Sequence, residues 1–302
     1  MTITPGYSGD IEWVLESAYG TTPSAQQLQI PADAVIRCHL DINREVKRHY
    51  GITSHSAVDT TYHTKAYTLS LEYELQLLKT TGAQHNVDET LGYHATHRTA
   101  GDLDSLSIYF EAGTEAFLLK GGLVNKYSWD CSQDNAIHVT VEIIGNAVET
   151  GANLAALTNY TGQTASAAIA TAIEIFEGSA ITRSGKWAEG IKSGSFSIDN
   201  QVERLFKAGS SEAVSVKPKF TVSEGATLVY ASDGGKTPVD DILSGDEVAI
   251  VFASGTTSSE SHEFTFGNAS YNAVPVVYET GMTGMSVDLK WGAESVAFAA
   301  VT

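Results

Sequence analysis

The sequence predicts a mainly β protein built from two tandem copies of one β-sandwich or half-barrel domain, each with a short flanking α-helix. Two observations carry this prediction. Several segments alternate polar and apolar residues with a period of two, and the second half of the chain repeats the order of segments found in the first half. We place the two domains at residues 1–150 and 151–302, as an internal duplication.

The alternating segments predict strands with one buried and one solvated face. Residues 66–75 read AYTLSLEYEL, with aromatic or aliphatic side chains at odd numbers and Thr, Ser or Glu at the even numbers from 68 to 74. The same pattern runs through residues 137–144, 195–202 and 285–291. Antiparallel sheets that cover a core on one face and meet water on the other show this alternation.

The repeat is clearest where LDINREVKRHY (40–50) and FSIDNQVERLF (196–206) match at an offset of 156 residues. Apolar residues occupy the same positions in both segments, and Arg48 matches Arg204. Five further pairs of segments keep the same order along the chain: 11–19 with 173–181, 66–70 with 219–223, 87–92 with 239–245, 106–114 with 248–256, and 139–145 with 287–293. Each match alone is weak, and their common order is what indicates duplication.

Short helices and long loops fall at corresponding positions of the two copies. Residues 87–92 and 237–245 each predict one short helix with an acidic first turn. The polar stretches 51–63 and 207–216 predict long loops, which are often functional. Residues 148–168, rich in Ala, Thr and Gly, are expected to link the copies.

The charge of the chain disfavours several classes of partner. Its 36 acidic and 18 basic residues give a formal net charge of −18, which repels nucleic acid. No apolar run reaches 18 residues and no basic region precedes an apolar one at the N-terminus, so we expect neither a membrane anchor nor a signal peptide. Cys38 and Cys131 are interpreted as two thiols in a reducing compartment, although the sequence leaves a bridge between them open.

The sequence contains no recognisable catalytic or ligand-binding motif. P-loop, GxGxxG, GxSxG, HExxH and paired CxxC motifs do not occur. His94 and His97 form an HxxH pair, but YHATHRTAG does not read as a helix and lacks further zinc ligands nearby. The repeat preserves apolar phase rather than polar catalytic residues. We therefore predict no catalytic residue, no metal site, no cofactor and no enzymatic activity, and we assign the four tryptophans to the core: Trp13, Trp129, Trp187 and Trp291.

Several motifs resemble a known family. The opening DIEWVLESAYGTTP has an E-x-x-Y-G-T-x-P core, formed by Glu16, Tyr19, Gly20, Thr21 and Pro23. It resembles the start of tail tube proteins (major tail proteins) of long-tailed double-stranded DNA viruses. The segments IRCHLDINREVKRHYGI and SGSFSIDNQVERLF resemble the two strand-and-loop units of that family, and the ending MSVDLKWG is also similar. The resemblance covers most of the chain in order and length.

The resemblance implies a structural virion protein that forms stacked rings of the tail tube, the conduit for genome ejection. Inner sheets of the subunits would join into one barrel. Expected partners are further copies of the chain and other tail proteins, with genomic DNA passing through without specific binding. The expected location is the virion tail, after assembly in the host cytoplasm. Two copies per chain would allow a trimeric, pseudo-hexameric ring; the alternative is a hexameric ring in which only one copy lines the lumen.

Candidate site residues follow from the strand pattern and from the resemblance. The polar phase of the alternating strands is expected to face the lumen: Asp41, Asn43, Thr68, Ser70, Glu72, Glu74, Thr140, Glu142, Ser197, Asp199, Thr221, Ser223, Asp288 and Lys290. Cations and histidines in and beside the two long loops are candidates for ring-on-ring stacking: Arg44, Lys47, Arg48, His49, His55, His63, Arg204 and Lys207.

Other structural roles fit the same pattern of strands. A tail terminator, a baseplate hub ring or a capsid decoration protein could use a related fold, and copy number in a particle would separate these from a tube. A two-domain β adhesin or carbohydrate-binding module would display exposed aromatic clusters, whereas the aromatic residues here mostly share the buried phase.

Overall fold

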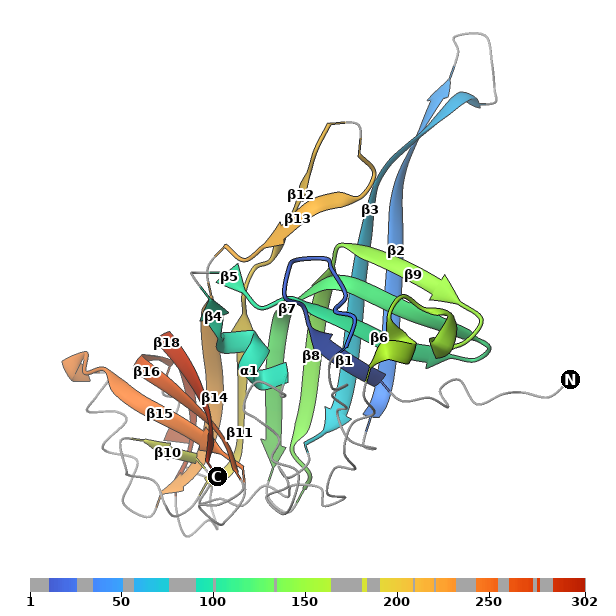
Figure 1. The fold of residues 1–302 in the computed structure, drawn as a ribbon. Helices are drawn as coiled ribbons and strands as arrows, with labels where there is room; N and C mark the ends of the chain where they lie inside the picture. The colour runs from blue at the N-terminus through green and yellow to red at the C-terminus, as the bar shows by residue number, and fades with distance from the viewer. Residues whose placement is uncertain are drawn as a thin grey trace, which may run out of the picture.

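The computed structural model describes residues 11–25, 35–50, 57–75, 91–99, 102–132, 135–163, 181–183, 191–208, 210–219, 221–231, 243–254, 261–273, 276–277 and 285–301. Within these residues the chain is mainly β, as the alternation predicts (Figure 1). The helical elements of the described residues include α1 (Leu91–Thr96) and two 3-10 turns, η2 (Leu154–Ala156) and η3 (Tyr160–Gly162).

The strands divide between the two halves of the chain. The first half contains β1 (Ile11–Leu15), β2 (Val35–Tyr50), β3 (Ala57–Glu74), β4 (Arg98–Thr99), β5 (Asp102–Leu103), β6 (Leu106–Ala112), β7 (Glu115–Ser132), β8 (His138–Gly145) and β9 (Ala147–Gly151). The second half contains β10 (Ile181–Arg183), β11 (Ile191–Asp199), β12 (Glu203–Phe206), β13 (Ala213–Lys217), β14 (Val222–Ala231), β15 (Val248–Ala253), β16 (Ser261–Ala273), β17 (Val276–Val277) and β18 (Met285–Val301).

One antiparallel sheet runs through both halves in the order β10-β15-β16-β18-β14-β11-β7-β8-β3-β2. The long strand β7 belongs to two layers. Its first part pairs with β6 and β9, and its second part lies between β8 and β11. Gly121, at a φ of +61°, and Gly122 mark the change of direction. A Cβ at Gly121 would lie 2.9 Å from Cβ of Asn146, so this bend requires glycine.

The strand order within the first half is β2-β3-β8-β7-β6-β1, and within the second half it is β11-β14-β18-β16-β15-β10. A strand at a given position in the order of the first half therefore has the corresponding strands as neighbours in the second half. Leu40 pairs with Leu69, and Phe196 pairs with Gly225, so both strands of each hairpin correspond at an offset of 156 residues. The sequence match of residues 66–70 with 219–223 was therefore wrong by three residues, because short alternating segments also match when displaced.

The core lies between the layers and is rich in aromatic residues. Trp129 of β7 and Phe196 of β11 pair across the junction of the two halves, with ring centroids 5.3 Å apart. Phe252, Phe264 and further rings of the second half pack around Phe196. Trp13, Trp129 and Trp291 are buried as expected, and Trp187 lies outside the described residues.

The helix α1 departs from the sequence expectation in position. Residues 91–96 are helical, including His94, although YHATHRTAG did not read as a helix. Leu91 and Ala95 are buried, and a Cβ at Gly92 would lie 2.9 Å from the Phe264 ring, so tertiary packing fixes this short helix. Of the second expected helix, only residues 243–245 are described, and 243–244 are helical.

The two polar stretches expected as loops are partly strands. Residues 57–63 belong to β3, and residues 213–216 belong to β13. The hairpin β2–β3 extends well beyond the body of the sheet, and the hairpin β12–β13 projects on the same side (Figure 1). Cys38 and Cys131 are free thiols. No helix within the described part of the chain is long and apolar enough to cross a membrane.

Candidate functional site

A continuous polar face crosses the main sheet and passes over the junction between the two halves. Strand pairing places one row of neighbours side by side on seven strands, from β2 to β18: Arg37, Glu72, Thr140, Ser128, Ser197, Glu224 and Gly292. A second row of neighbours is Glu74, His138, Asp130, Ser195, Ala226 and Lys290, and a third row is Ser70, Glu142, Lys126 and Asp199. These rows form the surface that we call the polar face.

On the same strands, the side chains that alternate with the polar ones are buried. The polar side chains must therefore point away from the core. Leu71 is 1% exposed and Val141 is fully buried, whereas Thr140 between β7 and β3 is exposed. Side chains alternate between the faces of a strand, so a one-residue slip would place the carboxylates in the core. Packing of the aromatic core thus determines which groups line the polar face.

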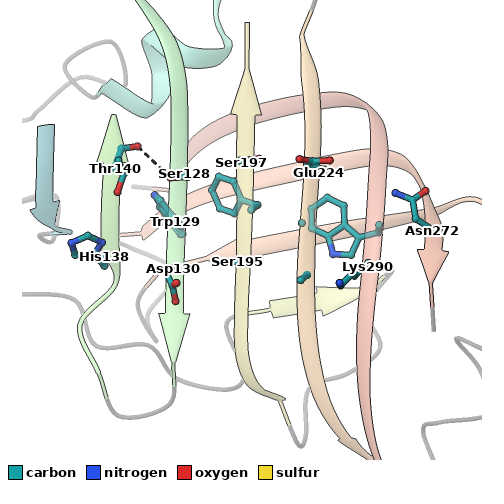
Figure 2. Close-up of a pocket in the computed structure, with 14 residues that line it drawn as sticks. Ser128, Trp129, Asp130, His138, Thr140, Ser195, Ser197, Glu224, Asn272 and Lys290 are labelled. Carbon is teal, nitrogen blue, oxygen red and sulfur yellow. Dashed lines mark hydrogen bonds between the residues drawn. The ribbon is translucent and has the colours of Figure 1, made fainter. Parts of the chain in front are cut away.

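The polar face is hollowed where the two halves meet. A groove of about 560 Å³ spans β8, β7, β11, β14, β18 and β16. Figure 2 shows Ser128, Ser197 and Glu224 along neighbouring strands, with Asp130 and Lys290 lower on the same surface. The hydroxyl of Ser128 donates to the carbonyl oxygen of Thr140 at 3.4 Å. The groove is open and belongs to a curved sheet surface rather than to an enclosed pocket.

Carboxylates outnumber cations on the polar face. The acidic residues are Glu72, Glu74, Asp130, Glu142, Asp199 and Glu224, and the basic residues are Arg37, Lys126 and Lys290. Arg37 pairs with Glu72 at 3.0 Å, and Lys126 lies 3.7 Å from Asp199. Exposed pairs of this kind contribute little to stability, about 0–1 kcal/mol each. Because the carboxylates outnumber the cations, the polar face keeps an excess of negative charge, which disfavours contact with phosphate groups.

Most of the expected polar-phase residues lie on this surface or continue it along the strands. Those on the polar face are Ser70, Glu72, Glu74, Thr140, Glu142, Ser197, Asp199 and Lys290. Asp41 and Asn43 are exposed on β2, beyond the rows, and the Asn43 amide donates to the Asp41 carboxylate at 2.7 Å. The side chain of Asp288 lies outside the described residues.

Ser223 does not belong to the polar face. Its side chain is 4% exposed, and its hydroxyl donates to the carbonyl oxygen of Ala293 at 3.1 Å. The three-residue error in the repeat alignment assigned the wrong phase to this strand, and Glu224 holds the exposed position instead. Thr221 lies before β14 and serves a structural network, because its hydroxyl donates to Asn200 and accepts from Arg98.

The sequence reasoning also missed the contribution of β7 to the polar face. The segment KYSWDCS alternates Lys126, Ser128 and Asp130 with three buried residues, so the period-two signal was present. His138 and Ser195 belong to the same row as Asp130. Arg37 and His39 on β2 could likewise have been found from the polar phase that contains Asp41.

Arg204, one of the candidates for ring-on-ring stacking, makes contacts within its own chain. One guanidinium nitrogen donates to the carbonyl oxygen of Tyr67 at 2.5 Å and to the Thr68 hydroxyl at 3.0 Å. Burial lowers the pKa of Arg204 below its usual value. Glu212 supports the same attachment, because its carboxylate accepts from Lys65 at 2.6 Å and from the Tyr67 hydroxyl. The hairpin β12–β13 is thereby fastened to β3.

The remaining stacking candidates are distributed along the two hairpins. Arg44, Lys47 and Arg48 are exposed on β2, and Lys207 is exposed just after β12. His49 and His63 lie in β2 and β3, with side chains outside the described residues, and His55 lies outside them altogether.

The opening motif has a structural explanation. The buried Glu16 carboxylate accepts from the Gly20 amide at 2.6 Å, the Ser107 hydroxyl at 2.6 Å and the Gly121 amide at 2.9 Å. Gly20 has a φ of +69°, which favours glycine. The motif therefore ties the turn after β1 to the bend of β7. Near α1, His97 lies 2.9 Å from Asp104, and no metal-binding group of three ligands occurs among the described residues.

Comparison with known proteins identifies a family over nearly the whole chain. A family model described as phage tail tube protein matches residues 6–293. A search of curated proteins found no match.

Proposed function

Because the chain belongs to the phage tail tube protein family, we propose that three copies close into a ring, that rings stack into the tail tube, and that the genome passes through it. The family is structural rather than enzymatic, and its members assemble with themselves and with other tail proteins in the virion tail. Assembly of this chain would take place in the host cytoplasm before the tail is complete.

The polar face carries this proposal. It is continuous from β2 to β18, including the junction of the two halves, and its carboxylates outnumber its cations. In the ring this face would line the lumen. Each contact between a cation and a phosphate adds salt-dependent affinity and slows sliding, so an acidic lining lets DNA move without being bound.

An internal duplication underlies the proposed stoichiometry. The shared strand order of the halves and the constant offset of 156 residues across both hairpins support it. Two similar units in each chain would give six units in a ring of three, with pseudo-sixfold symmetry. The junction of β7 with β11 would then be repeated between chains.

Two sheet edges support ring closure. Within the described residues, β2 pairs only with β3, and Ile42 is 49% exposed although its counterpart Ile198 on β11 is fully buried. At the other end of the sheet, β16 and β17 both pair with β18. They occupy the side of β18 that corresponds to the side of β8 on which β7 lies. Joining β2 of one chain to the side of β17 in the next that has no partner among the described residues would close the sheet and remove both edges.

The projecting hairpins are the proposed contacts between rings. Arg44, Lys47, His49, His55 and His63 belong to the first hairpin region, and Lys207 to the second. Single surface ion pairs contribute about 0–1 kcal/mol, so stacking would depend on many contacts repeated around the ring.

Electron microscopy of the purified full-length chain tests the proposal. Hollow tubes or stacked rings with threefold symmetry are expected as concentration rises. Rings of six chains would refute the trimeric arrangement, and a protein that neither assembles alone nor joins tubes nucleated by tail initiator proteins would refute the tube function.

A further inference from the structure

The two long hairpins correspond residue by residue. Arg204 pairs with Val216 and Glu203 pairs with Lys217, whereas Arg48 pairs with Thr60 and Lys47 pairs with Thr61. Each residue of the first hairpin and its counterpart in the second are 156 positions apart in the sequence. The same offset relates the strands from which the two hairpins extend. The hairpin β2–β3 and the unit β11–β14 with β12–β13 therefore have the same length and register.

The second hairpin lies against the first half of its own chain. Val202, Ala213 and Val216 pack with Leu103, Leu123 and Ile144 in one apolar cluster. Arg204 reaches over the polar face of β3 to the Tyr67 carbonyl oxygen and the Thr68 hydroxyl. The amide of Lys65 donates to the carbonyl oxygen of Ser211 at 2.8 Å. These contacts form beside the β7–β11 pairing, which joins the halves.

The β2 side of the first hairpin is not covered in this way by the described residues of its chain, although it carries the corresponding groups. Val46, the counterpart of the partly buried Val202, is 43% exposed, and Arg48 is exposed. The counterparts of Tyr67 and Thr68 are Ser223 and Glu224 on β14. Glu224 is exposed and corresponds to Thr68, whose hydroxyl accepts from Arg204 in the intramolecular junction.

We propose that Arg48 of each chain docks on β14 of the neighbouring chain in the ring and forms an ion pair with the carboxylate of Glu224 beside the Ser223 carbonyl oxygen. A second copy of the chain is thus the occupant of this surface. The pair takes the place that Arg204 and Thr68 hold within the chain, with a charged acceptor replacing a neutral one. This inference rests on the proposed ring and names its lateral contact.

A groove at the base of β2 supports the same occupant. It has a volume of about 390 Å³ and is lined by Cys38, Leu40, Ile42, Phe110 and Phe117, among others. Leu40 and Phe117 correspond to Phe196 and Phe264.

In the intramolecular junction, the corresponding position is filled by Trp129. Its ring centroid lies 5.3 Å from that of Phe196 and 5.1 Å from that of Phe264. The residue that corresponds to Trp129 in β17 is Val276, because each pairs with corresponding residues of β8 and β18. β17 of the neighbouring chain would thus lie over the groove while Arg48 reaches Glu224.

Charge reversal tests the proposed pair in the full chain. Arg48→Glu and Glu224→Arg should each lower the ring association constant by roughly tenfold or more, because each places like charges together. The double variant should recover it. Lys47→Glu is the matched control for the contact within a ring, since its counterpart Glu203 pairs with Lys219 at 3.0 Å on its own hairpin. Lys47 belongs to the proposed contacts between rings, so this variant should leave the ring association constant unchanged and weaken only stacking. Native mass spectrometry measures the rings, and circular dichroism checks that each monomer is folded.

A mixture of the two single variants adds a test that depends on ring size. Alternating variants satisfy every interface in a ring of six, but a ring of three always retains at least one like-charged interface. If the wild-type chain forms rings and the single variants form them equally well, the Arg48 contact is overturned. The same holds if the double variant does not recover ring formation. Either result leaves the tube function intact. Absence of rings and tubes from the wild-type chain under all conditions would overturn both.

Cross-linking provides a second measurement that does not depend on a loss of assembly. A variant carrying Arg48→Cys and Glu224→Cys, assembled and treated with a short bis-maleimide, should yield covalent trimers under denaturing conditions. The single cysteine variants are the controls. Assembled rings of the doubly substituted chain that yield only monomers would contradict the proposed contact.

Discussion

Replacing Phe196 by alanine should strongly destabilise the chain, because this side chain joins its two halves. Phe196 is 2% exposed, and its ring centroid lies 5.3 Å from that of Trp129, 5.0 Å from that of Phe252 and 4.8 Å from that of Phe264. Truncating a buried phenylalanine costs about 3–5 kcal/mol. Each aromatic pair contributes about 0.5–1.5 kcal/mol beyond buried area. We therefore expect the free energy of unfolding to fall by about 4–5 kcal/mol, a large share of the stability of a typical domain.

Urea unfolding at 25 °C, followed by tryptophan fluorescence and circular dichroism, measures this loss. Trp129 next to Phe196 makes the fluorescence signal sensitive to the junction. Leu40→Ala is the matched control, because Leu40 holds the corresponding place on β2 and is only partly buried. It should cost the monomer less than about 2 kcal/mol and weaken ring formation instead. A loss below about 1 kcal/mol for Phe196→Ala, or equal losses for both variants, would refute the view that one junction is permanent and the other awaits a partner.

Three further predictions concern packing, pH and the polar face. Gly225→Ala should destabilise the chain by about 1–3 kcal/mol, because the new Cβ would lie 2.3 Å from the Trp291 ring; thermal unfolding measures this. Burial lowers the pKa of His262 to about 4, so the unfolded state, with a histidine pKa near 6.5, binds the proton first as pH falls. Stability should drop by about 3 kcal/mol between about pH 6.5 and pH 4, and the drop should be smaller in His262→Gln; identical pH profiles would exclude this assignment. Thr140→Lys with Ser197→Lys should make assembled tubes bind double-stranded DNA in a salt-dependent manner, measured by co-sedimentation, whereas wild-type tubes should not.

Period-two alternation was sufficient to predict the β class and most of the polar face, because each strand buries one set of side chains. It could not fix the register between repeated segments. Leu69 and Gly225 correspond in the pairing, but a leucine and a glycine give no sequence match. The match was therefore displaced by three residues, and Ser223 was assigned to the wrong phase. The large Trp291 ring occupies the space above Gly225, so the compensation is tertiary and invisible to local comparison.

Other differences have similar physical causes. The helix α1 is too short to be stable alone, and burial of Leu91 and Ala95 determines it. Arg204 and Arg48 look alike in sequence, yet only the neighbouring surface decides that Arg204 is held by Tyr67 and Thr68. Local patterns do not reveal such surfaces, because they are formed by strands more than a hundred residues away.

The junction within the chain differs from the proposed junction between chains in a way that would keep ring assembly reversible. The intramolecular junction is formed once, on folding, and it uses large aromatic residues such as Trp129 and Phe196. The corresponding edge of β2 presents the smaller Leu40 and Ile42, together with exposed cations such as Arg48. Charged residues on an edge strand oppose random pairing with other chains. In the proposed ring, a neighbour that supplies Glu224 at the matching position would convert this protection into a specific attraction, so that the same cation would discourage aggregation and select the correct partner.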